Sequence, residues 1–112
     1  MAVNSKRKGA AGEREIAALL REYGFMDAQR GCQYHGGADS PDVKGVPHIH
    51  IEVKRVEKLN INEAMKQAER DCGDAIPTVW HRKNRTPWLV TMHLDDFMTI
   101  YKGAKDNGIF DR

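Results

Sequence analysis

The sequence lacks an apolar run long enough to span a bilayer, and its first residues lack the apolar segment of a signal peptide. It contains only two cysteines, Cys32 and Cys72, which is too few for a disulfide framework. We therefore expect free thiols in a reducing compartment, a cytoplasmic location and no membrane partner. No internal repeat, low-complexity tract or linker is present, so we expect the 112 residues to form one domain.

An excess of one charge is also missing, because 18 basic and 16 acidic residues leave a net charge of only +2. This balance alone does not indicate a nucleic-acid partner. The basic residues nevertheless gather in three clusters, which are Lys6-Arg7-Lys8, Lys54-Arg55 with Lys58, and Arg82-Lys83 with Arg85. Such clusters suit a phosphate backbone, although each one alone also fits a solvated surface.

The apolar periodicity predicts an α/β protein with a mixed sheet between helices. Residues 1–8 are expected to form a mobile basic arm. Helices are predicted at about 10–23, 61–72 and 94–101, and strands at 28–33, 42–46, 48–55, 76–81 and 88–92. The helix residues expected to face inward are Ile16, Leu19, Leu20 and Tyr23, then Ile61, Ala64, Met65, Ala68 and Cys72, then Leu94, Phe97, Met98 and Tyr101.

The predicted strand at 48–55 alternates apolar residues with His50, Glu52 and Lys54. Glu52 and Lys54 therefore share one face. One interpretation is a solvated face with a surface ion pair worth about 0–1 kcal/mol. The other is a metal-binding carboxylate beside a catalytic lysine.

Two further carboxylates support the second interpretation. Glu13 lies at the edge of the apolar stripe of the first helix, and Gly9 and Gly12 on the same helix would allow a ligand or another backbone to approach closely. Asp42 follows Pro41, whose fixed φ presents it rigidly at the start of a strand. For either residue alone, an ion pair at a helix start or an ordinary turn aspartate remains open.

Taken together, Asp42 and Glu52 are expected to be cross-strand neighbours that share one hard cation. The backbone carbonyl of Val53 would add a ligand, and Lys54 would activate water and counter phosphate charge. This is the chemistry of phosphodiester hydrolysis.

Pro41-Asp42 followed by Glu52-Val53-Lys54 resembles the signature of the PD-(D/E)XK nucleases. The segment KGAAGEREI at residues 8–16 is similar to the first helix of archaeal-type Holliday junction resolvases and related phage nucleases. The resemblance covers roughly residues 5–70. It implies a restriction-endonuclease-like αβββαβ core and an intracellular protein of bacterial or phage origin.

The resemblance also implies roles for individual residues. Asp42, Glu52 and the Val53 carbonyl would hold Mg²⁺, for which Mn²⁺ should substitute, with Glu13 contributing directly or through water. Lys54 would be the catalytic lysine. The residues expected to contact DNA are Lys6, Arg7, Lys8, Arg14, Arg30, Ser40, Arg55, Gln67, Arg82, Lys83 and Arg85.

The predicted function is a metal-dependent, structure-selective DNA endonuclease of the Holliday junction resolvase type, acting in recombination or repair. Cutting a two-fold symmetric junction further implies a homodimer. A restriction-like or repair nuclease, or a non-catalytic DNA-binding module on the same fold, stays open. The loop from Cys32 to Ser40 departs from the family pattern, and the roles of Cys32, His35, His48 and His50, including a structural zinc site, are left undetermined.

Overall fold

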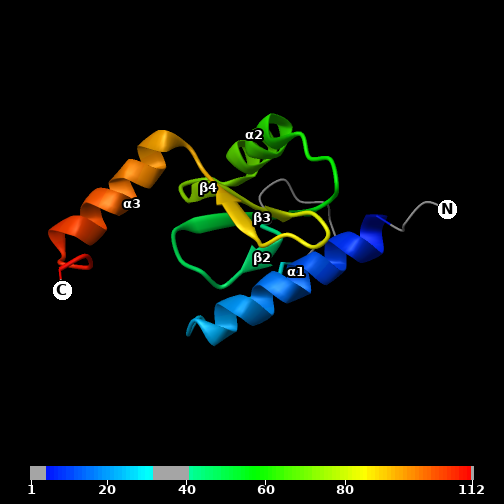
Figure 1. Ribbon diagram of the computed structural model, residues 1–112, viewed down its shortest axis with the longest axis horizontal. Helices are drawn as coiled ribbons and strands as arrows, with labels where there is room; N and C mark the ends of the chain where they lie inside the picture. The colour runs from blue at the N-terminus through cyan, green and yellow to red at the C-terminus, as the bar shows by residue number, and fades with distance from the viewer. Residues whose placement is uncertain (1–4, 32–40, 112) are drawn as a thin grey trace.

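A computed structural model describes residues 5–31 and 41–111, with side chains from residue 9 onward. Three helices and five strands follow one another in the order α1, β1, β2, β3, α2, β4, β5 and α3 (Figure 1). Their bounds are Ser5–Glu22, Gln29–Arg30, Val43–Lys44, Ile49–Arg55, Ile61–Asp71, Ile76–Arg82, Leu89–Thr91 and Leu94–Asp106.

The strands form one mixed sheet in the order β1-β2-β3-β4-β5. Only β3 and β4 run parallel, and α2 is the crossover helix that connects them. The remaining neighbours are antiparallel. Helices α1 and α2 lie on opposite faces of the sheet, so β3 is covered on both sides (Figure 1). The predicted α/β fold with a restriction-endonuclease-like core is confirmed.

The core on one face forms where α1 packs against β3. Ile16 and Leu20 of α1 contact Ile51 and Val53 of β3, and all four side chains are buried. Each such side chain contributes about 1.5–3 kcal/mol when it leaves water. Gly12 lies in the same contact, since a β-carbon there would be 3.2 Å from Cβ of Arg55. The missing side chain therefore brings the first turns of α1 close to the end of β3.

The core on the other face forms beneath α2. Ala64, Met65 and Ala68 of α2 pack against Val79 of β4, as the periodicity predicts. The helix begins at a capped end, where the side-chain oxygen of Asn60 accepts a hydrogen bond from the backbone N–H of Glu63 at 3.1 Å. This packing fixes α2 over the polar side of β3.

Three predictions about the helices were wrong. Helix α1 begins at Ser5 rather than near Ala10, so residues 5–8 of the predicted arm are helical, and residues 1–4 lie outside the described part. Tyr23 is 80% exposed because α1 ends at Glu22 and the chain turns at Gly24, whose φ is 104°.

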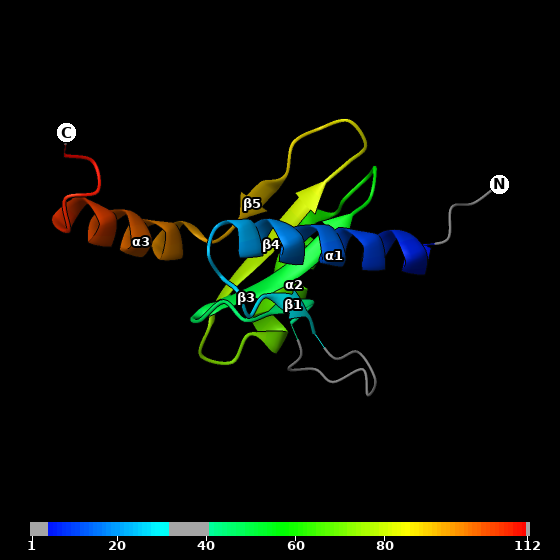
Figure 2. The ribbon, with the colours of Figure 1, turned by 90° about the horizontal axis from the view of Figure 1, so that it is seen from below.

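The third correction concerns α3, which extends to Asp106, and none of its residues is buried. Its four predicted core residues are therefore exposed. Figure 2 shows α3 projecting from the end of β5, away from the sheet. Within the described ranges, no helix has the combination of length and apolar content that crossing a bilayer requires.

Candidate active site

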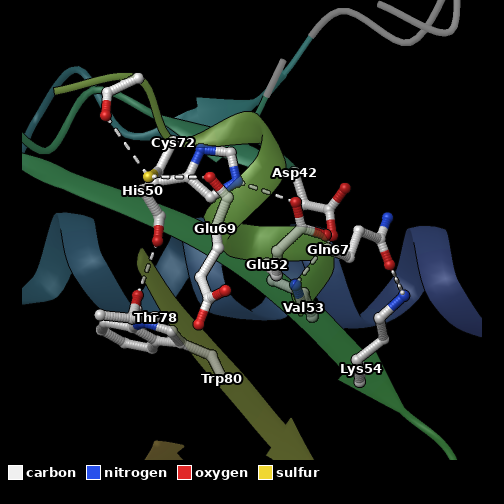
Figure 3. Close-up of polar contacts among 11 residues, drawn as sticks. Asp42, His50, Glu52, Val53, Lys54, Gln67, Glu69, Cys72, Thr78 and Trp80 are labelled. Carbon is white, nitrogen blue, oxygen red and sulfur yellow. Dashed lines mark hydrogen bonds and ion pairs between the residues drawn. The ribbon is translucent and has the colours of Figure 1, made fainter. Parts of the chain in front are cut away.

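Asp42 and Glu52 meet across two neighbouring strands. The antiparallel register that pairs Val43 with Ile51 places Asp42 directly opposite Glu52. The backbone N–H of Asp42 donates to the carbonyl of Ile51 at 2.9 Å, and the N–H of Val53 donates to Oδ2 of Asp42 at 2.8 Å. Figure 3 shows the two carboxylates pointing toward each other. The structure thus has the cross-strand arrangement expected of them.

Glu52 is buried beneath α2 rather than solvated. Glu52 is 1% exposed and the neighbouring His50 is 3% exposed. Oε1 of Glu52 lies 2.8 Å from Nε2 of His50 (Figure 3). The other oxygen, Oε2, is buried without a hydrogen-bond partner among the described residues. A buried carboxylate oxygen that lacks a partner is destabilising, and a cation would satisfy it.

The surroundings of Asp42 change the ionisation of its carboxyl group. Burial, followed by the charge of Glu52, raises the pKa of Asp42 to about 7, although the hydrogen bond from Val53 opposes the shift. Glu13 adds a smaller contribution in the same direction. Like charges that lie close together resist ionising together, and a divalent cation between them would offset this repulsion.

The available ligands fit a cation that keeps several waters. Backbone N–H and C=O groups of one strand residue point to the same edge, so the Val53 carbonyl faces the side on which its N–H meets Asp42. Among residues 9–31 and 41–111, no three His, Cys, Asp or Glu side chains form a ready-made metal cluster. Two carboxylates, one carbonyl and water match the usual environment of Mg²⁺.

Glu13 of α1 faces the same region, but its carboxylate already forms an ion pair with an arginine of the protein. Its Oε1 accepts a hydrogen bond from Nε of Arg30 at 2.9 Å, which links α1 to β1. Glu13 also lines the cavity that contains Asp42. This position suits a contact with a cation through water better than direct coordination.

Lys54 reaches into this cavity from the end of β3. Its Nζ donates to Oε1 of Gln67 on α2 at 3.0 Å, and Figure 3 shows the two side chains pointing toward each other. The contact replaces the Glu52–Lys54 surface ion pair that was the alternative interpretation. A cavity of about 230 Å³ is lined by Gly9, Glu13, Asp42, Val53, Lys54, Arg55, Val56 and Gln67. Its size and polar lining suit a phosphate group.

The predicted DNA-contacting residues divide into two groups. Arg55 and Gln67 line the cavity that contains Asp42, Arg30 is paired with Glu13 of the same cavity, and Arg14 is exposed on α1. Arg82 and Lys83 instead line a second cavity of about 420 Å³, which shares Val56 with the first. Arg85 lies in the turn between β4 and β5. The side chains of Lys6, Arg7 and Lys8, together with Ser40, Cys32 and His35, lie outside what the structure describes.

Arg82 is held in place by α1. It forms an ion pair with Glu15, which also accepts a hydrogen bond from the indole N–H of Trp88 at 2.7 Å. Its guanidinium carbon lies 5.8 Å from the centre of the Trp88 ring. Trp88 therefore serves packing and orientation.

Sequence reasoning missed His50. It was considered only as a strand residue or a zinc ligand, whereas its contact with Glu52 fixes the orientation of that carboxylate. The period-2 pattern already placed His50 and Glu52 on one face, so their contact was detectable had that face been recognised as buried. His48 lies in the preceding turn with a φ of 71° and is exposed.

The comparison with known families agrees with this geometry. Residues 4–110 match the family described as "Phage putative PDDEXK endonuclease". No curated protein and no solved structure matches the chain. Nucleases of the PD-(D/E)XK type generally depend on a divalent metal, and an endonuclease of this type acts on DNA. Because the match spans nearly the whole sequence, the chain belongs to this family of phage PD-(D/E)XK endonucleases.

Proposed function

We propose that this protein is a Mg²⁺-dependent endonuclease that hydrolyses DNA phosphodiesters near branch points, and that residues 1–112 form its single nuclease domain. The observation that carries the proposal is the pairing of the half-buried Asp42 with the buried Glu52. One oxygen of this pair has no hydrogen-bond partner among the described residues, and Lys54 stands at the same cavity. Mn²⁺ is expected to replace Mg²⁺, since both accept oxygen ligands in this geometry.

A bound divalent cation would supply charge stabilisation for the attacked phosphate and lower the pKa of a coordinated water. Asp42 and Glu52 would hold that cation, with the Val53 carbonyl beside them. Val53 also keeps Asp42 in place through its N–H, and His50 does the same for Glu52. These four groups are therefore assigned to binding and orientation.

Lys54 is assigned to the attacking water and to the phosphate. Its ammonium group would hydrogen-bond the attacking water, orient it and offset the negative charge that develops on the phosphate oxygens. Gln67 accepts one N–H of Lys54 and leaves the other two free to reach substrate. Gln67 thus acts as a positioning residue for the lysine.

The arginines around the cavity support a nucleic-acid substrate. Arg55 lines the cavity that contains Asp42, and Arg30 pairs with Glu13, which lines it too. The N–H at Nε of Arg55 is buried without a hydrogen-bond partner among the described residues. Arg82 and Lys83 continue the basic lining past Val56. Cations arranged around a carboxylate pair would bind the backbone on both sides of the phosphate being cut.

The organisation of the described elements supports our proposal of a preference for branched DNA. Apart from α3, every described helix and strand belongs to the sheet, covers it, or lines one of the two cavities. None of these elements therefore forms a separate module for reading bases. Backbone contacts position a protein on DNA without reading its sequence, which favours recognition of shape. A four-way junction is two-fold symmetric, so paired incision would require two copies of the site, and we include a homodimer in the proposal.

A cleavage panel with Mg²⁺ tests the chemistry. Four-way junction, fork, flap, linear duplex and single strand are compared for the wild type, Asp42→Asn and Lys54→Ala. Both variants should lose cleavage and keep DNA binding, whereas Asp74→Asn and Lys66→Ala, at exposed positions away from the cavity, should cut as the wild type does.

The outcomes separate the candidate functions. Wild-type rates in either active-site variant would refute the assignment of the site. Tight, metal-independent binding without cleavage of any substrate would instead favour a non-catalytic DNA-binding module. Equal rates on all duplex substrates would remove the branch preference and leave the nuclease.

A further inference from the structure

The C-terminal helix α3 carries an apolar stripe that nothing in the described structure covers. Leu94, Phe97, Met98 and Tyr101 are spaced as one helical face, and their exposed fractions range from 41% to 72%. The aromatic rings of Phe97 and Tyr101 stack with centroids 6.3 Å apart, and Phe110 folds back to 5.4 Å from Tyr101. The exposed apolar surface is thus organised as a single face.

Helix α3 gains little stability from packing against the other described elements. It has 13 residues, contains Gly103, and its N-cap residue His93 makes no side-chain capping bond. Helices of about this length are marginal in water without tertiary packing. An ion pair between His93 and Glu69 of α2 anchors only its base. A surface that packs along the stripe is therefore needed for the helix to persist.

The charges of this segment argue against DNA or a lipid surface as the covering partner. Four aspartates and only two lysines lie between Leu94 and Asp111. An acidic segment is repelled by phosphate backbones. Helices that bind membrane surfaces carry lysine and arginine along their polar face, which is also not the case here.

We propose that α3 packs antiparallel against α3 of a second copy of this chain, forming a symmetric homodimer. In this pairing Leu94 of one copy lies opposite Tyr101 of the other, and Phe97 lies opposite Met98. An isologous interface requires a self-complementary surface. The stripe meets this requirement because each of its apolar residues faces another apolar residue of the stripe when the second copy is reversed.

The flanking charges fit the same antiparallel register. Asp95 and Lys102 are seven residues apart and border the same edge of the stripe, one near each end of the helix. Reversing the second helix brings Asp95 of one copy toward Lys102 of the other. Lys102 contacts Asp106 of its own helix at 2.8 Å, yet its side chain is 74% exposed and free to reach a second acid.

The available area is also sufficient. Further exposed apolar side chains are Ile100, Ile109 and Phe110 on α3 and the turn after it, and Leu89 and Val90 on the edge strand β5. Aromatic side chains carry about 150–250 Å² each, and nine partly exposed apolar side chains therefore offer on the order of 800 Å² per copy. One partner in a standard stable interface contributes about this area.

Sedimentation velocity between 1 and 100 µM, on the full chain without DNA or metal, tests the interface on its own. The wild type should be a dimer, and Phe97→Glu should be monomeric. Thr99→Glu introduces the same side chain on the polar side of α3 and should stay dimeric. A monomeric wild type throughout this range would overturn the proposal, as would a dimeric Phe97→Glu variant.

A charge-swap experiment tests the antiparallel register without changing an apolar residue. Asp95→Lys and Lys102→Asp should each weaken self-association at least tenfold, because each places like charges opposite one another. Mixing the two variants restores opposite charges at both positions and should give a heterodimer of wild-type affinity. Failure of the mixture to associate would refute this register even if the wild type is dimeric. Since the dimer is measured without substrate, loss of the nuclease proposal would not affect this result, nor would the reverse.

Discussion

Replacing Asp42 by asparagine is expected to stabilise the metal-free protein while abolishing its response to Mg²⁺. The pKa of Asp42 is raised from 3.8 to about 7, chiefly by burial and by the charge of Glu52. An acid whose folded-state pKa exceeds its unfolded value favours folding when protonated. Its contribution is complete below pH 3.8 and is lost as pH rises toward about 7. The neutral amide of asparagine avoids this loss.

The size of the effect follows from two opposing terms. A shift of about three pKa units corresponds to roughly 4 kcal/mol, since one unit is worth about 1.4 kcal/mol. The hydrogen bond from the Val53 N–H to a charged oxygen becomes one to a neutral oxygen, which loses on the order of 1 kcal/mol. We therefore expect a net gain of about 1–3 kcal/mol at pH 8, or very roughly 4–12 °C in Tm for a domain of this size.

Thermal unfolding in EDTA and in Mg²⁺, at pH 4 and pH 8, measures both effects. In EDTA, the Tm of Asp42→Asn should exceed that of the wild type at pH 8, and the difference should vanish at pH 4. In Mg²⁺ at pH 8, the wild type should gain stability by linkage and the variant should not. Asp74→Asn, at an exposed turn position, is the matched control and should follow the wild type. An equal Mg²⁺ response in Asp42→Asn, or a lower Tm at pH 8 in EDTA, would refute the reasoning.

Two further substitutions test how the site is positioned. His50→Ala should raise the Kd for Mg²⁺ by about 10–100-fold in calorimetric titration, because Glu52 loses the contact that orients it. His48→Ala, at an exposed position, is the control. An unchanged Kd in His50→Ala would show that the histidine only fills space. Gly12→Val should lower the free energy of unfolding by about 1–3 kcal/mol in denaturant titration, since its side chain meets Arg55 on β3. Gly9→Ala, at a helical position where a β-carbon meets nothing within 4 Å, should instead be neutral or stabilising by up to about 1 kcal/mol, and similar behaviour of both glycine variants would contradict the close approach of α1 to β3.

Sequence reasoning located correctly those elements whose apolar pattern reflects a face buried inside the protein. The stripe of α2 and the alternation of β3 are both set by a covered face, and both elements match their predicted positions within a residue or two. Asn60 caps the start of α2, and the chain turns at Gly24 after α1 ends. Local chemistry and burial point to the same structure at these positions.

Helix α3 shows where periodicity stops being informative. The spacing of Leu94, Phe97, Met98 and Tyr101 identifies a shared apolar face, and this face exists. Periodicity does not specify which surface covers that face, and within this chain no described element does. The error therefore lay in assuming an intramolecular core, and an intermolecular one satisfies the same pattern.

The site was predicted in composition but not in environment. An alternating strand is expected to bury one face and solvate the other, and by that rule His50, Glu52 and Lys54 belong to the solvated face. However, β3 is a central strand whose neighbour β4 is parallel, and a parallel pair requires a crossover helix that covers a face of the sheet. Helix α2 is that cover, and it encloses Glu52 almost completely. A charged residue on a central strand beneath a crossover helix must find a partner or a cation, since burying it alone is strongly unfavourable. The topology therefore explains why the polar face of this strand is the active-site candidate: the helix that completes the fold also removes water from Glu52 and leaves one of its oxygens without a hydrogen-bond partner among the described residues.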